Sequence, residues 1–268
     1  MREALETAKF AARAGGRVLE AMRTDMGSVR SKAWATDFVT EADVASGVAV
    51  VRAILQRDKG ARFVVEEDEV YDLVGATRGT VDDSEVWVID PLDGTTSFVH
   101  GYPTYSVSVA LLRDSQPVAG AVYNAAAGEM NAAALGLGAE RDEIRLHVGE
   151  ASDVREALLI TGFPYDRGEP LDRQIAVLSA FLRAPVHGVR RDGSAAVDCC
   201  HVAGARADGF WEYALKPWDM AAGVVILREA GAKVTDVEGV MWSARSASIV
   251  AANARLHEGM LDVIRNTA

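Results

Sequence analysis

Short apolar segments bounded by turn-forming residues recur along the whole chain, and they constrain the fold more than any other feature. Runs of this kind, rich in valine and isoleucine, are typical of buried strands. In the first half, the tetrapeptide RDSQ joins two of them as a hairpin. The predicted strands are 61–65, 85–89, 106–112, 117–124 and 129–135, followed by 157–161, 186–190, 208–212, 232–236 and 247–251.

Segments with apolar residues at three- and four-residue spacing alternate with these strands and predict helices. An opening helix is expected over 3–23, and a second follows Thr40 and runs to about Arg57. Further helices are expected near 171–183, 194–205, 218–230 and 255–265.

The order of these elements predicts an α/β protein of layered α+β type, formed by one domain (1–268) with two lobes. Residues 1–145 would form an α+β lobe in which a helix layer lies beside a hairpin-linked sheet. Residues 146–268 would form an α/β lobe. We expect the lobes to meet between residues 140 and 155.

Composition excludes several classes of function. The chain has 268 residues, 49% hydrophobic and 25% charged, which is ordinary for a globular protein with a substantial core. A net charge of -11 argues against general binding to nucleic acid or to an anionic membrane. No uninterrupted apolar run approaches the length of a membrane span, so a cytoplasmic protein is expected.

Cys199 and Cys200 are adjacent in a predicted helix, and we expect reduced, buried thiols.

Two carboxylates follow a buried strand in WVIDPLDGTTSF (87–98), at Asp90 and Asp93. Pro91 is expected to end the strand and Gly94 to allow a tight turn before a short helix. Other elements also end or begin at carboxylates, namely Asp43, Glu66, Glu67 and Asp219. Each has a structural explanation of its own: a turn, a capping box with Thr40, a solvated strand end, or a charge at the positive end of a helix.

If these carboxylates converge, a divalent cation becomes the natural partner. Two carboxylates about 4 Å apart repel by about 4 kcal/mol at an effective dielectric near 20. A bound cation removes this penalty, and oxygen ligands with few histidines favour Mg²⁺ or Mn²⁺ over zinc. Sites of this kind are suited to phosphoryl transfer.

The motifs around these residues resemble those of the inositol monophosphatase family, the Mg²⁺-dependent, lithium-sensitive phosphatases. The resemblance rests on DFVTEAD (37–43), VEED (65–68), DPLDGTTSF (90–98), TGFPYD (161–166), GSAAVDCCHVAGARADGFWE (193–212), KPWDMAAG (216–223) and REAGAKVTD (228–236). It extends from about Lys32 to the final helix and implies the alternating helix and sheet layers of the inositol monophosphatase and fructose-1,6-bisphosphatase type.

The resemblance implies a metal site with two or three Mg²⁺ ions, with Mn²⁺ as an alternative. Glu66, Asp90 and the Leu92 carbonyl would bind the first ion. Asp90, Asp93 and Asp219 would bind the second, and Glu66 would also touch a third. Most of these ligands come from the first lobe, and Asp219 comes from the second.

It also implies the catalytic and substrate-binding residues. Thr95, with Asp43 behind it, would orient and deprotonate the attacking water, while backbone N–H groups of Gly94 and Thr95 would face the phosphate. Lys32 would support the metal-binding loop, although it could also be an ordinary surface lysine. The alcohol half of the substrate would contact Gly193, Ser194, Ala195 and Glu212.

Two alternatives concern the second lobe. The segment GSAA (193–196) is also a good helix start, with Ser194 near the cap. Arg190 and Arg191 could steer an anionic substrate or be surface charges, and no role is assigned to them.

The chain departs from the family pattern at three places. Val65 replaces a glycine before Glu66. This puts in doubt the bend into Glu66 and the register that decides whether Glu66 or Glu67 faces the site. Ser97 replaces an asparagine. An asparagine-glycine turn is replaced within AERDEIRL (139–146), which concerns the local hairpin.

The expected function is hydrolysis of inositol monophosphate, or of a related small sugar or polyol phosphate, by direct attack of water. The D-x-x-D spacing differs from the D-x-D-x-T spacing of phosphatases that form an aspartyl phosphate. Related enzymes act on fructose 1,6-bisphosphate, histidinol phosphate, nucleotide 3′-phosphates or NADP. Another alternative is a partner-binding regulatory protein with secondary activity. A homodimer without membrane or direct nucleic-acid contacts is expected.

Overall fold

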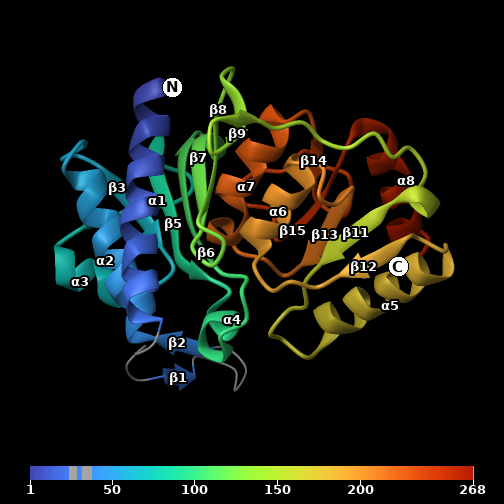
Figure 1. Ribbon diagram of the computed structural model, residues 1–268, viewed down its shortest axis with the longest axis horizontal. Coiled ribbons are helices and arrows are strands. Elements are labelled where there is room, and N and C mark those ends of the chain that lie inside the picture. The colour runs from blue at the N-terminus through green and yellow to red at the C-terminus, as the bar shows by residue number, and fades with distance from the viewer. Residues whose placement is uncertain (24–28, 32–37, 268) are drawn as a thin grey trace.

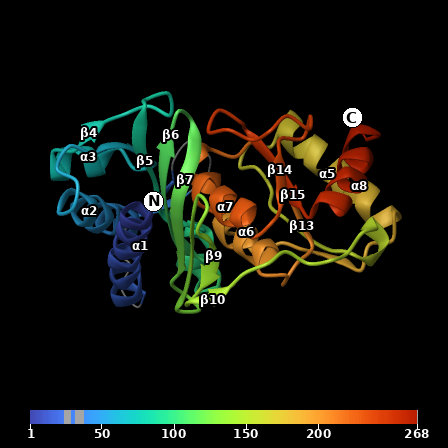
Figure 2. The same ribbon diagram turned by 90° about the horizontal axis from the view of Figure 1, so that it is seen from above.

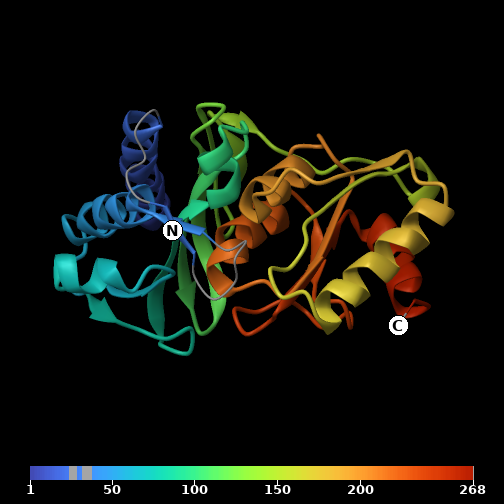
Figure 3. The same ribbon diagram turned by 90° about the horizontal axis from the view of Figure 1, so that it is seen from below.

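Helices and sheets stack in alternating layers in the computed structural model, which describes residues 1–23, 29–31 and 38–267. Seen from above, the order is a helix layer, a large sheet, a central helix layer, a small sheet and an outer helix layer (Figures 1 and 2). The first and last helices lie at opposite ends of this stack (Figure 3). The predicted layered α/β fold is confirmed.

The large sheet has eight strands and is built mainly from hairpins. Its spatial order is β10-β9-β8-β7-β6-β5-β3-β4, and every pair from β5 to β10 is antiparallel. Only β3 pairs in parallel with its neighbours β4 and β5. The strands are β3 (Arg62–Val65), β4 (Thr77–Arg78), β5 (Glu85–Asp93), β6 (Ser106–Arg113), β7 (Gln116–Asn124), β8 (Glu129–Ala134), β9 (Gly138–Arg141) and β10 (Ile144–Arg145).

The first helix layer covers one face of this sheet. It contains α1 (Arg2–Met22) and α2 (Glu41–Leu55), which pack on each other and on β5, β6 and β7. The predicted stripe of α1 is buried at Ala8, Ala12 and Leu19. The short helix α3 (Glu69–Val74) packs beside α2.

The central helices α6 (Ala195–Ala203) and α7 (Pro217–Glu229) cover the other face of the large sheet. Residues 220–227 of α7 are all buried, as expected for a helix enclosed on every side. A single hydrophobic cluster joins Val88 and Ala110 of the large sheet with both helices and with Phe210 of the small sheet. The two sheets therefore share one core across the central layer.

The small sheet is mixed, with spatial order β12-β11-β13-β15-β14. Strand β11 pairs in parallel with β12 and β13, and β15 is antiparallel to β13 and β14. Helices α5 (Glu169–Arg183) and α8 (Ala254–Arg265) cover its outer face. The strands are β11 (Leu158–Thr161), β12 (Gly188–Arg190), β13 (Gly209–Tyr213), β14 (Lys233–Thr235) and β15 (Ser248–Ala252).

Strand β5 extends further than predicted. The strand was expected to end before Pro91, but it continues to Asp93, which pairs with Ser106 of β6. The register with β6 shifts between Asp90 and Asp93, so the strand passes Pro91 through an irregularity. Such bulges accommodate a proline that cannot donate to the ladder. The short helix expected after it is α4 (Thr95–His100).

The smallest elements were not predicted as separate units. They are β1 (Val29–Ser31), β2 (Phe38–Thr40), α3, β4, β9, β10 and the 3₁₀ turn η1 (Val154–Glu156). Each is too short to show a full period of apolar spacing. Cys199 and Cys200 of α6 are free and buried, as expected.

We propose that the two sheets mark the two lobes predicted at 1–145 and 146–268. All strands of the large sheet precede residue 146, and all strands of the small sheet follow residue 157. Helix α7 belongs to the second lobe by sequence but packs directly on β6, β7 and β8. The lobes thus meet over an extensive apolar contact.

The hairpin questioned at 139–146 is present, since β9 and β10 pair in antiparallel fashion. Its two turn residues, Asp142 and Glu143, have φ angles of 48° and 71°. This is the left-handed conformation that two-residue hairpin turns require and that glycine adopts most easily. The turn keeps its shape without the expected asparagine-glycine pair, at the cost of strain at Glu143.

Glu143→Gly is therefore expected to stabilise the protein by about 0.5–1 kcal/mol, because it relieves a positive φ at an exposed position. Urea unfolding monitored by tryptophan fluorescence would measure this. Glu143→Ala is the matched control, since it removes the same charge but keeps the β-carbon. Equal stabilisation by both variants would assign the effect to charge.

Candidate active site

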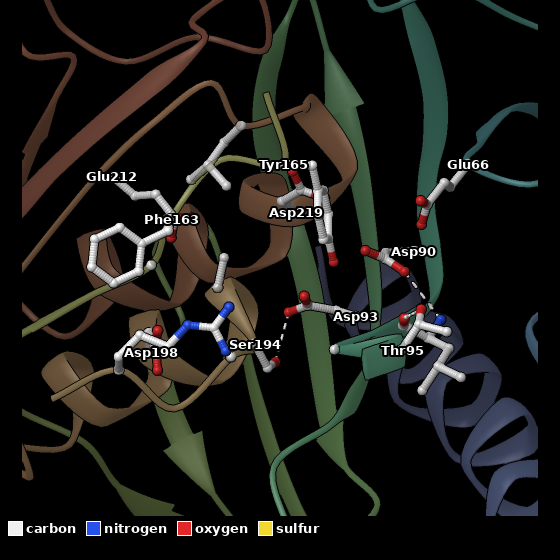
Figure 4. Close-up of a pocket in the computed structure, with 17 residues that line it drawn as sticks. Glu66, Asp90, Asp93, Thr95, Phe163, Tyr165, Ser194, Asp198, Glu212 and Asp219 are labelled. Atoms are coloured by element: carbon white, nitrogen blue, oxygen red, sulfur yellow. Dashed lines mark hydrogen bonds between the residues drawn. The ribbon is translucent and has the colours of Figure 1, made fainter. Parts of the chain in front are cut away.

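A cavity opens where the two halves of the chain meet, and most of the predicted site residues line it (Figure 4). The first half contributes Glu66, Asp90, Leu92, Asp93, Gly94 and Thr95. The second half contributes Gly162, Phe163, Tyr165, Arg191, Gly193, Ser194, Ala195, Asp198, Glu212, Leu215 and Asp219. Carboxylates from distant parts of the chain therefore converge, as the sequence analysis expected.

The irregular end of β5 places Asp90 and Asp93 on the cavity. The Leu92 N–H donates to Asp90 Oδ1 over 3.0 Å, which holds the first carboxylate against its own turn. Gly94 then has a φ of 94°, and an added Cβ would lie 3.0 Å from the carbonyl oxygens of Gly193 and Thr104. Both the backbone conformation and the close approach of the second half thus require glycine at this turn.

Asp43 lies behind Thr95 and serves two structural elements at once. Its Oδ2 accepts hydrogen bonds from the Thr40 N–H at 2.8 Å and the Thr40 hydroxyl at 2.6 Å, completing the capping box of α2. Its Oδ1 lies 3.0 Å from Thr95 Oγ1, which is also 3.1 Å from the Leu92 carbonyl oxygen. Burial raises the pKa of Asp43 to about 6, although its hydrogen bonds to Thr40 and Thr95 oppose the shift.

Glu66 follows the end of β3, at a bend of the chain. Val65 stays in the strand and pairs with Ile89, and the Glu66 N–H donates to the Ile89 carbonyl over 3.2 Å. Glu66 lines the cavity and faces Asp90, whereas Glu67 is buried outside the cavity (Figure 4). Valine is therefore compatible with the predicted register, in which Glu66 is the residue at the site.

Asp219 reaches the cavity from the first turn of α7. The Lys216 N–H donates to Asp219 Oδ2 over 2.7 Å, so this carboxylate also caps the start of its helix. Pro217 at the first helical position favours this sharp start. The structural explanation considered for Asp219 is correct, and the residue nevertheless lines the site.

Asp93 links the two halves of the chain. Its Oδ2 accepts hydrogen bonds from the Ser194 hydroxyl at 2.6 Å and from the Ala196 N–H at 2.8 Å (Figure 4). Ser194 is the N-cap of α6, as considered, and its hydroxyl also lies 3.2 Å from Ser106 Oγ. The start of α6 is thereby fixed on the end of β5.

The carboxylates of the cavity are destabilised by burial and by repulsion from one another. Burial, followed by repulsion from neighbouring carboxylates, raises the pKa of Asp90 and of Asp219 well above the usual range. Burial raises the pKa of Asp93 to about 6, against the hydrogen bonds from Ser194 and Ala196. In the described part of the chain, no lysine or arginine forms an ion pair with these aspartates. Their negative charge calls for a cation from outside the protein.

The donor set fits magnesium chemically. Carboxylate oxygens of Glu66, Asp90, Asp93 and Asp219 face this part of the cavity beside the hydroxyl groups of Thr95 and Tyr165, and Leu92 lines it too, which matches the preference of hard divalent cations for oxygen. Within residues 1–23, 29–31 and 38–267, however, no three Asp, Glu, His or Cys side chains are already close enough together to hold an ion. The predicted ligands share one cavity but do not form a finished coordination shell.

The far wall of the cavity contains Glu212 and residues to which the sequence analysis assigned no role. Glu212 is the last residue but one of β13, and its carboxylate lies where a Cβ on Gly162 would come within 2.3 Å of Oε1 and Oε2. Burial, then repulsion from Asp93, raises the pKa of Glu212 to about 8. Phe163 and Asp198 lie on this side of the cavity in Figure 4, Arg191 also lines the cavity, and Tyr165 lies nearer Asp219.

Different signals could have revealed these additional residues. Phe163 and Tyr165 lie within TGFPYD, which carried part of the resemblance, and Arg191 was considered without a role. Asp198 lies within GSAAVDCCHVAGARADGFWE (193–212), which also carried part of the resemblance, but no role was assigned to it. Lys32 lies outside the described residues.

Comparisons with known proteins agree with this geometry. The model of the inositol monophosphatase family matches residues 1–267. The chain is 36% identical over 263 residues to an inositol-1-monophosphatase of Synechocystis, covering 98% of this chain and 89% of that protein. It is 38% identical to a putative Nus factor SuhB of Neisseria meningitidis serogroup B, with 97% of each chain covered.

The solved structure of an inositol monophosphatase from Anabaena has a similar fold, with a TM-score of 0.86 and 35% identity. The match covers 98% of this chain and 96% of that one. Sequence, fold and the converging carboxylates agree, and the chain belongs to the inositol monophosphatase family.

Proposed function

We propose that this protein is a Mg²⁺-dependent phosphomonoesterase that hydrolyses inositol monophosphate or a related small sugar or polyol phosphate. The observation that carries the proposal is a cluster of buried carboxylates beside the Thr95–Asp43 hydrogen bond. Family membership supports the general activity. The substrate and the metal requirement are our inferences.

Glu66, Asp90, the Leu92 carbonyl, Asp93 and Asp219 would hold two or three Mg²⁺ ions, with Mn²⁺ as a substitute. Bound there, the metal would neutralise the phosphate, lower the pKa of the attacking water and stabilise the leaving oxygen. The protein contributes an all-oxygen donor set, buried at Asp90 and Asp93 and half-buried at Glu66 and Asp219, that is fixed by two helix starts and a bent strand. Lys32 would support this region.

Thr95 and Asp43 would position and deprotonate the attacking water. Asp43 Oδ2 is already held by Thr40, which leaves Oδ1 for the Thr95 hydroxyl. Thr95 lines the cavity, whereas Asp43 is buried behind it. A proton can therefore pass from water to Thr95 Oγ1 while the threonine proton moves to Asp43 Oδ1. A pKa of about 6 for Asp43 is near the range that suits a general base.

The substrate would lie across the junction of the two halves. Backbone N–H groups of Gly94 and Thr95 would face the phosphate. Gly193, Ser194, Ala195 and Glu212 would contact the alcohol half. The hydrogen bonds between Asp93 and the start of α6 set the spacing between these two regions. Direct attack by water requires no covalent phosphoenzyme.

A regulatory role is the second candidate. Relatives of similar length include a Nus factor SuhB of Haemophilus influenzae, 38% identical over 85% of this chain. An acidic chain related to such proteins could bind a protein partner and hydrolyse phosphate esters only secondarily. The two candidates differ in their dependence on the carboxylates of the cavity.

Location and assembly are further proposals. No described helix combines the length and the apolar character needed to cross a membrane. We propose a cytoplasmic homodimer acting on small phosphorylated polyols, without direct contact to nucleic acid.

Asp93→Asn is expected to reduce phosphate release from myo-inositol 1-phosphate by at least about 10²-fold, because it removes a charge from the proposed metal site. A phosphate-release assay with Mg²⁺, with and without a chelator, would measure this. Asp172→Asn on the exposed side of α5 is the matched control. Absence of chelator-sensitive release from any ester would favour the regulatory role.

Thr95→Val is expected to lower kcat by about 10²–10⁴-fold with little change in KM, since it removes the hydroxyl that relays the proton. Thr95→Ser keeps this hydroxyl and should retain most activity. Steady-state kinetics on the same ester would separate the two variants. Similar kcat values for serine and valine would remove Thr95 from proton transfer.

Glu212→Gln is expected to stabilise the metal-free protein increasingly between pH 4.5 and 8. The folded pKa is raised from 4.5 to about 8, so the folded state binds this proton more tightly and wild-type stability falls as pH rises through that window. The full penalty is on the order of 5 kcal/mol at about 1.4 kcal/mol per pKa unit.

Urea unfolding with chelator at pH 5 and pH 8 would measure this difference. Glu238→Gln is the control, because Glu238 is exposed on the loop after β14. A pH-independent difference between wild type and Glu212→Gln would show that the buried glutamate is not the cause.

A further inference from the structure

Three charged side chains form the far wall of the cavity, away from the proposed metal ligands. Asp198 comes from α6, Glu212 from the end of β13 and Arg191 from the loop between β12 and α6. In Figure 4, Asp198 and Glu212 lie with Phe163 on the side opposite Glu66 and Asp90. We call this set the alcohol wall.

The side chains of the alcohol wall form no hydrogen bond or ion pair with the described residues, although the charge of Arg191 acts on both acids. Asp198 is 1% exposed, and its Oδ1 is buried without a hydrogen bond. Glu212 is 7% exposed and makes no side-chain hydrogen bond with any described residue. Arg191 is exposed and likewise forms no ion pair or hydrogen bond within the described part of the chain.

Leaving such groups unpaired is costly, which indicates that they serve a ligand. A buried donor or acceptor without a partner costs about 1–3 kcal/mol, and more when it is charged. Burial raises the pKa of Asp198 well above the usual range, followed by repulsion from Glu212 and Asp192, while Arg191 opposes the shift. The three side chains therefore offer hydrogen-bond donors and acceptors to a ligand at the edge of the cavity.

Hydroxyl groups match this arrangement better than a second phosphate does. A hydroxyl donates one hydrogen bond and accepts others, so neighbouring hydroxyls can donate to carboxylates and accept from a guanidinium. A second phosphate would meet two acids and one arginine, which is net repulsion. Phe163 adds apolar surface beside Glu212, as is usual where a carbon ring must be oriented.

We propose that Asp198 and Arg191 bind hydroxyl groups of the leaving alcohol next to Glu212, and so select polyhydroxylated esters without a second negative charge on that half. This inference rests on the proposed function, since it assigns the alcohol specificity of the same cavity.

The test compares an ester with hydroxyls to one without them. We would measure kcat and KM for myo-inositol 1-phosphate and 4-nitrophenyl phosphate in wild type, Asp198→Asn, Arg191→Gln and Arg191→Lys. Asp198→Asn and Arg191→Gln should raise KM for the inositol ester by about tenfold or more, with kcat largely kept. For the aryl ester, both constants should change by less than about twofold. Arg191→Lys should restore part of the loss, because it keeps a donor and the charge.

Asp192→Asn is the matched control. It removes a negative charge near Asp198 and Arg191, but Asp192 lines the neighbouring pocket with Arg191, Thr96 and Tyr102 and does not line the cavity itself, so it controls for charge without contact to the alcohol. Its KM for the inositol ester should match that of wild type. Thermal unfolding should show Asp198→Asn to be at least as stable as wild type, because an unpaired buried charge is removed.

Two results would overturn the inference. If Asp198→Asn and Arg191→Gln raise KM equally for both esters, the wall acts on the phosphate or on folding. If Arg191→Gln lowers kcat/KM for fructose 1,6-bisphosphate more than for myo-inositol 1-phosphate, the arginine recognises a second anion instead.

A binding measurement separates this inference from the proposed function. Saturation-transfer NMR with free myo-inositol, in the presence of Mg²⁺ and inorganic phosphate, should show a signal that weakens in Asp198→Asn and Arg191→Gln. If wild type hydrolyses no ester but still shows this pattern, the proposed function fails and the polyol site stands. If wild type hydrolyses esters but inositol binding is the same in all variants, the alcohol wall is wrong and the phosphatase stands.

Discussion

Mutual repulsion among buried carboxylates is the constraint on which the rest of this structure depends. Asp90, Asp93 and Asp219 are held in a cavity where burial and like charges raise their pKa values. A fold tolerates such a cluster only if rigid elements hold it in place. Here the rigid elements are the irregular end of β5, the start of α7 and the start of α6, which come from both halves of the chain.

Structural and functional explanations of the same residue prove compatible in this protein. Asp43 completes a capping box and accepts a hydrogen bond from Thr95 with its other oxygen. Asp219 caps α7 and lines the cavity. Helix starts offer backbone N–H groups that hold a carboxylate in one orientation, and this is also what a site of converging side chains needs. Capping is part of how the cavity is built.

Much of the fold could be predicted from the sequence because its longer elements have clear periods. The helices of both halves and the strands of the two sheets appear close to the expected ranges. The extension of β5 past Pro91 could not be predicted, because the pairing of Asp93 with Ser106 depends on a neighbouring strand. The site carboxylates were predicted from motifs, but Asp198 was not, since a single acid within a helix carries no local signal. Its place on the cavity appears only when α6 packs against β13.

The hydrogen bonds from Ser194 and Ala196 to Asp93 couple the positions of the two ends of the cavity. Asp198 lies one turn further along the helix that begins at Ala195. Any rotation of the Asp93 carboxylate that breaks these bonds releases the first turn of this helix, and the wall that faces the alcohol moves with it. The proposed metal site and the proposed alcohol wall are thus coupled through a single side chain.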